Sequence, residues 1–113
     1  MKLDRCIAGN QGLGKYAILK LRTLKEVRGR VDSKAWNRVA DAISVLEDEG
    51  ILDWGLQGTE SEFFLIRLKD EFALPALKAY AAAAEDHDFE YATEVRDMAQ
   101  RSGGYSPFCK KPD

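Results

Sequence analysis

Residues 62–69, Glu-Phe-Phe-Leu-Ile-Arg-Leu-Lys, decide the fold class that this sequence predicts. Phe64, Ile66 and Leu68 lie at every second position, so an extended backbone places them on one apolar face. Aromatic and β-branched residues favour a strand, and its apolar face must point into a core. A short extended segment at 51–54 comes before this strand, and turn residues lie between the two. Residues 51–69 are therefore predicted to form a β-hairpin.

A helix is predicted on the N-terminal side of this hairpin. From about Lys34 to Glu49, apolar residues recur at the three-and-four spacing of one helix face. Asp32 or Ser33 can accept hydrogen bonds from the first backbone N–H groups, and Gly50 can adopt the conformation that ends a helix. The apolar face consists of Trp36, Val39, Ala40, Ile43 and Leu46.

Two more helices are predicted after the hairpin. The alanine-rich segment 71–85 favours a helix, with Pro75 near its first turn. Asp88 can cap a third helix, which Gly103 and Gly104 would end. The short connection predicts a helical hairpin. Residues 105–113 show no periodicity and are predicted to form an extended tail.

Residues 15–24 allow two interpretations. Ala17, Leu19 and Leu21 alternate with more polar neighbours, which favours a strand. A helix that continues to Val27 would also gather several of these apolar residues on one side. With the strand adopted, residues 15–104 are predicted to form a single compact α+β domain in the order β-α-β-hairpin-α-α. Its helices would pack on a short antiparallel sheet, after a flexible glycine-containing lead-in at 1–14.

Residues 36–69 carry a resemblance to a known family. An apolar helix, an acidic turn, Gly50-Ile51-Leu52 and the predicted hairpin follow one another. This order resembles the recognition helix and wing of winged-helix proteins. The resemblance implies a winged-helix-like fold and DNA binding, with the exposed helix face in the major groove and the wing along the backbone.

Charge divides the chain unevenly. Residues 15–38 carry eight Lys or Arg and two Asp or Glu, a net charge of +6. Residues 39–113 carry seven Lys or Arg and sixteen Asp or Glu, a net charge of −9. Such asymmetry indicates an anionic partner, or attraction between the two halves within a chain or between copies. The candidate interaction residues are therefore basic, with two aromatic residues that could supply an apolar contact: Lys20, Arg22, Lys25, Arg28, Arg30, Lys34, Arg38, Trp54 and Phe63.

Motifs that would indicate catalysis are incomplete. Gly9 to Lys15 fits the first seven places of the phosphate-binding P-loop pattern, but Tyr16 stands where a Ser or Thr must hold magnesium. His87 is the only histidine, and adjacent acids on a loop rarely converge with it on one metal ion. We therefore predict no catalytic residues, no cofactor and no metal site.

The sequence predicts a small non-enzymatic protein that acts by macromolecular interaction. The expected role is a protein-binding adaptor or inhibitor, and self-association is equally allowed. A winged-helix-like nucleic-acid binder that uses segment 15–38 is the alternative. The charged N-terminus and the lack of a long apolar run predict a cytoplasmic protein without a membrane partner. Cys6 and Cys109 allow one disulfide between the two ends of the chain, although free thiols are expected in that compartment.

Overall fold

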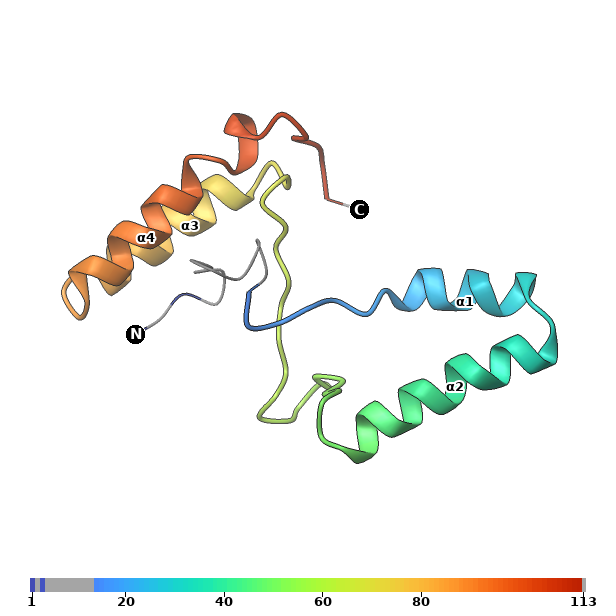
Figure 1. The fold of residues 1–113 in the computed structure, drawn as a ribbon. Coiled ribbons are helices and arrows are strands. Elements are labelled where there is room, and N and C mark those ends of the chain that lie inside the picture. Colours follow the sequence, from blue (N-terminus) through green and yellow to red (C-terminus); the bar gives the residue numbers. More distant parts are fainter. Residues whose placement is uncertain (2, 4–13, 113) are drawn as a thin grey trace. The chain divides into compact units, whose positions relative to one another are not determined.

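The computed structural model describes residues 1, 3 and 14–112. These residues form α1 (Leu21–Arg30), α2 (Ser33–Asp48), α3 (Ala73–Ala84), α4 (Phe89–Ala99) and the 3-10 turn η1 (Gly103–Tyr105) (Figure 1). Over the same residues there is no strand, and an isolated parallel bridge joins Asp70 to Lys110. The prediction of an α+β fold with an antiparallel sheet is therefore wrong, and the described part of the chain is helical.

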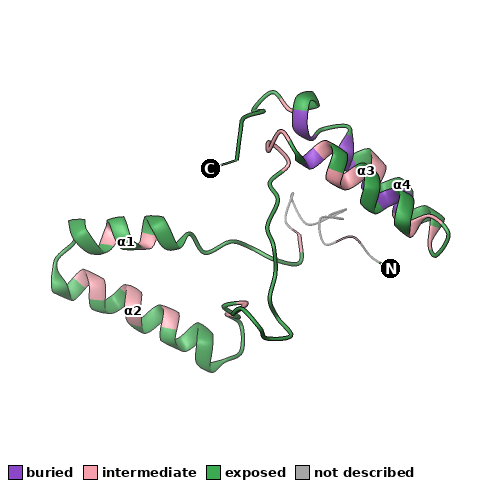
Figure 2. Ribbon diagram, turned by 180° about the vertical axis from the view of Figure 1, so that it is seen from behind, coloured by how far each residue is buried: buried purple, intermediate pink, exposed green. Residues whose placement is uncertain are grey.

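The chain divides into two compact units. Residues 18–64 form the α1–α2 unit, and residues 1–17 together with 65–113 form the α3–α4 unit. Among the residues that the structure describes, the buried ones all lie in α3, in α4 or at Ser102 and Gly103 just after α4 (Figure 2). The predicted single domain over 15–104 stays a prediction.

At the start of the α1–α2 unit, the structure differs from the predicted strand. Residues 16–20 form no regular secondary structure and the chain becomes helical at Leu21, so the strand predicted at 15–24 is wrong. The helix places Leu24 and Val27 on its half-buried side, which a strand could not do. Arg28 and Arg30 lie in the last turn, where positive charge stabilises the helix terminus.

α2 confirms the helix predicted at 34–49. The Asp32 carboxylate accepts a hydrogen bond from the Ala35 N–H at 2.8 Å, and so caps the N-terminus. Gly50 follows the helix with φ +71°, a conformation that L side chains rarely adopt. The Arg28 guanidinium lies 5.3 Å from the centroid of the Trp36 ring and connects α1 with α2 by a cation–π contact.

The predicted β-hairpin at 51–69 does not form. The Glu62 N–H donates to the Thr59 carbonyl at 3.1 Å, and the Gly58 N–H donates to the Glu62 carboxylate at 3.0 Å. Gly55 and Gly58 have φ values of +59° and +82°. These local turns close the loop on itself, so no ladder joins 51–54 to 62–69. These residues therefore do not form the hairpin that would be the wing of a winged-helix protein.

α3 and α4 confirm the helices predicted at 71–85 and after Asp88. Small side chains let the two helices approach closely, because alanine adds little bulk at their contact. Asp88 caps α4 by accepting the Tyr91 N–H at 3.0 Å, as the sequence predicts. The Ser102 hydroxyl donates to the Ala99 carbonyl at 2.7 Å, which satisfies a buried polar group. The buried apolar residues are Ala73, Ala81, Ala92, Val95, Met98 and Ala99.

The C-terminal segment is attached to the start of α3. After η1, the Lys110 N–H donates to the Lys69 carbonyl at 2.9 Å, and the Glu71 N–H donates to the Lys110 carbonyl at 3.0 Å. The Gly103 N–H donates to the Leu68 carbonyl at 2.8 Å. The segment predicted as an extended tail is thus partly folded back by backbone hydrogen bonds. In the parts of the chain that the structure describes, no helix combines the length and apolar character needed to cross a membrane.

Candidate interaction surface

The loop after α2 is held by backbone hydrogen bonds to the end of that helix. The N–H groups of Ile51 and Leu52 both donate to the Leu46 carbonyl, at 2.9 and 3.0 Å. The Asp53 carboxylate accepts the Gly55 N–H at 2.9 Å and so turns the chain directly before a glycine with positive φ. These bonds fix the path of residues 50–56 relative to α2.

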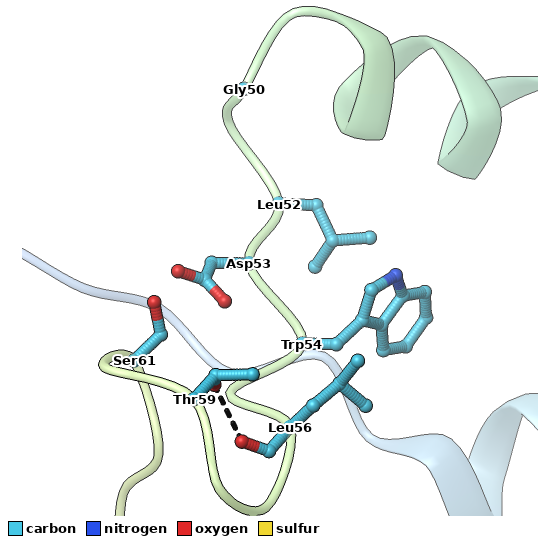
Figure 3. Close-up of a pocket in the computed structure, with 7 residues that line it drawn as sticks. All are labelled: Gly50, Leu52, Asp53, Trp54, Leu56, Thr59 and Ser61. Carbon is cyan, nitrogen blue, oxygen red and sulfur yellow. Dashed lines mark hydrogen bonds between the residues drawn. The ribbon is translucent and has the colours of Figure 1, made fainter.

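An open hollow of about 340 Å³ lies in this loop (Figure 3). Leu52, Trp54 and Leu56 supply its apolar side, and Leu56 is largely exposed. Asp53 and Ser61 lie on its polar side. The residues that line it are Gly50, Leu52, Asp53, Trp54, Leu56, Thr59 and Ser61.

Phe63 joins the same loop surface. Its ring lies against Gly55, so close that a Cβ atom added to this glycine would overlap two ring carbons. Trp54 is the preceding residue, and its side chain is partly exposed. The structure therefore brings both predicted aromatic residues onto one loop. We call Leu52, Trp54, Leu56 and Phe63 the loop surface.

Asp53 carries a fixed negative charge beside the loop surface. Its pKa is lowered, first by the hydrogen bond from the Ser61 hydroxyl and then by that from the Gly55 N–H. Both bonds favour the ionised carboxylate, and its exposure keeps the opposing desolvation effect small. A ligand of the loop surface would thus meet apolar side chains next to a carboxylate.

The predicted basic residues lie on the helices of the same unit. Arg22, Lys25, Arg28 and Arg30 belong to α1, Lys20 precedes it, and Lys34 and Arg38 belong to α2. All seven are exposed, and none forms an ion pair with another residue that the structure describes. Arg28 alone of the seven is positioned by an aromatic ring. The basic residues thus lie on or next to α1 and α2, whereas Trp54 and Phe63 lie on the loop after α2.

Sequence reasoning missed several residues of the hollow. Leu52 and Asp53 lie in the extended segment predicted at 51–54, and neither they nor Leu56 and Ser61 are predicted to contribute to an interaction surface. The available signal was the pair Gly55 and Gly58, because glycines spaced by three residues allow repeated reversal of the backbone. Such reversals favour a self-contained loop over a hairpin.

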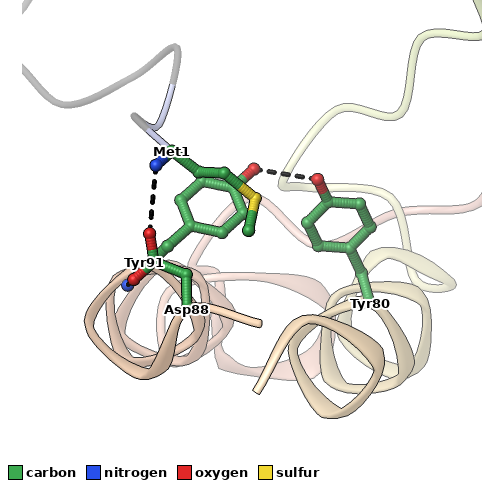
Figure 4. A network of polar contacts seen from close by, with 4 residues as sticks. All are labelled: Met1, Tyr80, Asp88 and Tyr91. Carbon is green, nitrogen blue, oxygen red and sulfur yellow. Dashed lines mark hydrogen bonds and ion pairs between the residues drawn. The ribbon is translucent and has the colours of Figure 1, made fainter. Parts of the chain in front are cut away.

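The polar cluster around Asp88 is structural (Figure 4). Besides capping α4, the Asp88 carboxylate lies 3.0 Å from the terminal ammonium of Met1. The pKa of Asp88 is lowered by the Tyr91 N–H and by this ammonium. The hydroxyls of Tyr80 and Tyr91 lie 2.9 Å apart, and their rings meet edge to face with centroids 6.1 Å apart.

The remaining sequence motifs add no chemical site. No three His, Cys, Asp or Glu side chains gather as metal ligands in the described parts of the chain. The glycine motif at 9–15 lies mostly outside the described residues, as do Cys6 and most of the lead-in at 1–14. Cys109 is an exposed free thiol.

Comparison with protein-family models, with curated proteins and with solved structures finds no match.

Proposed function

We propose that this protein acts by binding another protein through the loop surface. One observation carries the proposal: none of residues 18–64, all of which the structure describes, is buried, although this unit is rich in large apolar side chains (Figure 2). Apolar side chains that are not buried in a core stay in contact with water, and binding of a partner that removes them from water is favourable. Aromatic residues such as Trp54 and Phe63 are enriched at protein interfaces for this reason.

The charge of Asp53 narrows the chemistry of the partner. An ionised carboxylate beside an apolar hollow favours a protruding apolar side chain that is followed or preceded by Lys or Arg. The bound partner would cover the exposed surface of Leu56 and Phe63. We propose a cytoplasmic, non-enzymatic role for the protein, as an adaptor or inhibitor.

Capture of partners on the immobilised chain tests this proposal. Proteins retained by the wild type should be lost with Trp54→Ala, because the hollow loses its largest apolar side chain. Val45→Ala is the matched control, since Val45 is exposed and apolar in the same unit but lies on α2. Equal retention by Trp54→Ala and wild type would show that binding does not use the loop surface.

Nucleic-acid binding is a second candidate, favoured by a separate observation. The chain is helical from Leu21, and the seven basic residues are all exposed. Exposed Lys and Arg on two helices can contact phosphates, and the release of counterions then drives binding. The winged-helix fold is not required for this.

Fluorescence anisotropy with mixed-sequence DNA and RNA distinguishes the two candidates. If the helices bind phosphates, replacing Arg22, Lys25 and Arg30 by Gln should weaken binding and reduce its salt dependence. Arg28 is left intact because it contacts Trp36. Lys78→Gln, an exposed site on α3, is the control. Absence of binding at low salt would remove this candidate.

A further inference from the structure

The first residues of the α1–α2 unit expose apolar side chains next to basic ones. Ile18, Leu19 and Leu21 are 57%, 40% and 55% exposed. Lys20 and Arg22 lie beside them in the chain and are exposed as well. Apolar and cationic side chains are therefore both in contact with solvent over the short stretch 18–22, which belongs to one unit.

The outward side of α1 continues this basic stretch. Leu24 and Val27 are the half-buried residues of the helix. Helical periodicity places Arg22, Lys25 and Gly29 on the opposite side. A Cβ atom added to Gly29 would meet no atom within 4 Å in the described part of the chain. A flat surface can therefore approach the backbone of α1 closely on its basic side.

The charge of residues 18–31 favours an anionic partner. They carry five Lys or Arg and one acid, Glu26. None of these basic side chains forms an ion pair with another residue that the structure describes. The phosphates of nucleic acids and of lipid headgroups both complement such a segment. The exposed apolar side chains favour the lipid, because a bilayer has an apolar interior directly beneath its anionic headgroups.

We propose that residues 18–30 bind the surface of an anionic phospholipid bilayer. Ile18, Leu19 and Leu21 enter the boundary between headgroups and acyl chains. Binding at the surface needs no spanning helix, so the lack of a long apolar run, from which the sequence predicts no membrane partner, does not oppose it. The side chains that contact the headgroups are Lys20, Arg22, Lys25 and Arg30.

Co-sedimentation of the full chain with lipid vesicles tests this inference. Vesicles of phosphatidylcholine with about 30% phosphatidylglycerol should bind the protein, and vesicles of phosphatidylcholine alone should not. Raising the salt concentration from about 0.05 M to about 0.5 M should weaken binding, because the basic side chains are exposed and their charges are screened. Absence of binding to both kinds of vesicle, or equal binding to both, would overturn the inference.

Ile18→Ser tests the apolar contribution. It should weaken vesicle binding by about five-fold, because less apolar surface leaves water. Its circular dichroism should match that of the wild type, since Ile18 is exposed and precedes α1. Val45→Ser is the matched control and should bind as the wild type does, because Val45 is also 57% exposed but lies on α2. Equal binding by Ile18→Ser and wild type would overturn the inference.

Lys25→Gln tests the contribution of charge. It should weaken vesicle binding by about five-fold, whereas Lys78→Gln on α3 should not change it. Equal losses in these two variants would overturn the inference, because net charge alone would then explain binding.

Two further comparisons separate this inference from the proposed function. Ile18→Ser should leave the anisotropy with DNA and RNA unchanged, since phosphate contacts do not need an apolar side chain. Trp54→Ala should bind vesicles as the wild type does, because the loop surface takes no part in lipid binding. Loss of vesicle binding in Trp54→Ala equal to that in Ile18→Ser would overturn the assignment to residues 18–30.

Discussion

Single residues fix the start of α4 and the turn that follows the helix. Asp88 caps the first turn of the helix and also contacts the Met1 ammonium, so one carboxylate makes two kinds of contact. Gly103 has φ +54°, and its N–H donates to the Leu68 carbonyl. Each residue acts through its own contacts, so a substitution at one can be studied separately from a substitution at the other.

Acid should destabilise the α3–α4 unit through Asp88. Its pKa in the folded chain lies below the ordinary value of 3.8, so the unfolded chain binds a proton more readily. The contribution of Asp88 is therefore fully present above about pH 4 and is lost as pH falls through the lowered pKa. NMR titration of the Asp88 carboxyl measures its pKa in the folded chain. Urea unfolding between about pH 2 and pH 6 measures how the free energy of unfolding changes with pH.

Asp88→Asn separates charge from capping. Asparagine caps helices about as well as aspartate, but it does not titrate. This variant should keep the helix and lose part of the acid dependence of the unfolding free energy. An acid dependence identical to that of the wild type would mean that Asp88 does not contribute to it.

Gly103→Ala should destabilise the α3–α4 unit. A Cβ atom at this position would lie 2.8 Å from the Leu74 Cβ, and the positive φ strains any L side chain. We expect a loss of about 1–3 kcal/mol in the free energy of unfolding, measured by urea denaturation. Gly104→Ala is the matched control, because its Cβ would enter open space and should change little.

At the scale of whole elements, the contact between α3 and α4 depends on small side chains. Ala81→Leu adds bulk at a fully buried position, and should lower the free energy of unfolding by about 1–3 kcal/mol. Ala82→Leu is the control, since Ala82 is exposed on the same helix. Thermal melts of both variants check this, and equal melting temperatures would contradict the close contact.

The helices could be predicted where local signals suffice. α2 has an apolar face that recurs over about three turns, from Trp36 to Leu46, and a capping aspartate directly before its first residue, so its signals are local. Residues 15–24 offered only a few alternating positions, which cannot separate a strand from a helix. Residues 62–69 have strand propensity, but a strand also needs a partner, which the local sequence does not specify.

The loop surface could be predicted only in part. The sequence predicts that Trp54 and Phe63 supply an apolar contact on the open second face of a sheet, and the described part of the chain forms no such sheet. That Phe63 packs on Gly55 could not be derived, because it depends on a positive φ at one glycine. The hollow formed by Leu52 and Leu56 follows from the same turn.

At the scale of the whole molecule, the two units should differ in their resistance to opening. The α3–α4 unit contains every buried residue in the described part of the chain, whereas the fully described α1–α2 unit contains none. Amide exchange reports local opening, and it is slowest where burial is greatest. We expect the slowest amides in 73–99 and fast exchange in 21–48. Equal protection of both helix pairs would contradict this.

The alanines between α3 and α4 have a consequence for how this chain can change over time. Four of the buried positions already hold the smallest side chain with a Cβ atom, at 73, 81, 92 and 99. Enlarging any of them forces the helices apart, and shortening them leaves only glycine, which weakens a helix. Substitutions that strengthen this unit must therefore arise on its exterior, such as around the Arg96–Glu85 ion pair, while its interior stays nearly invariant.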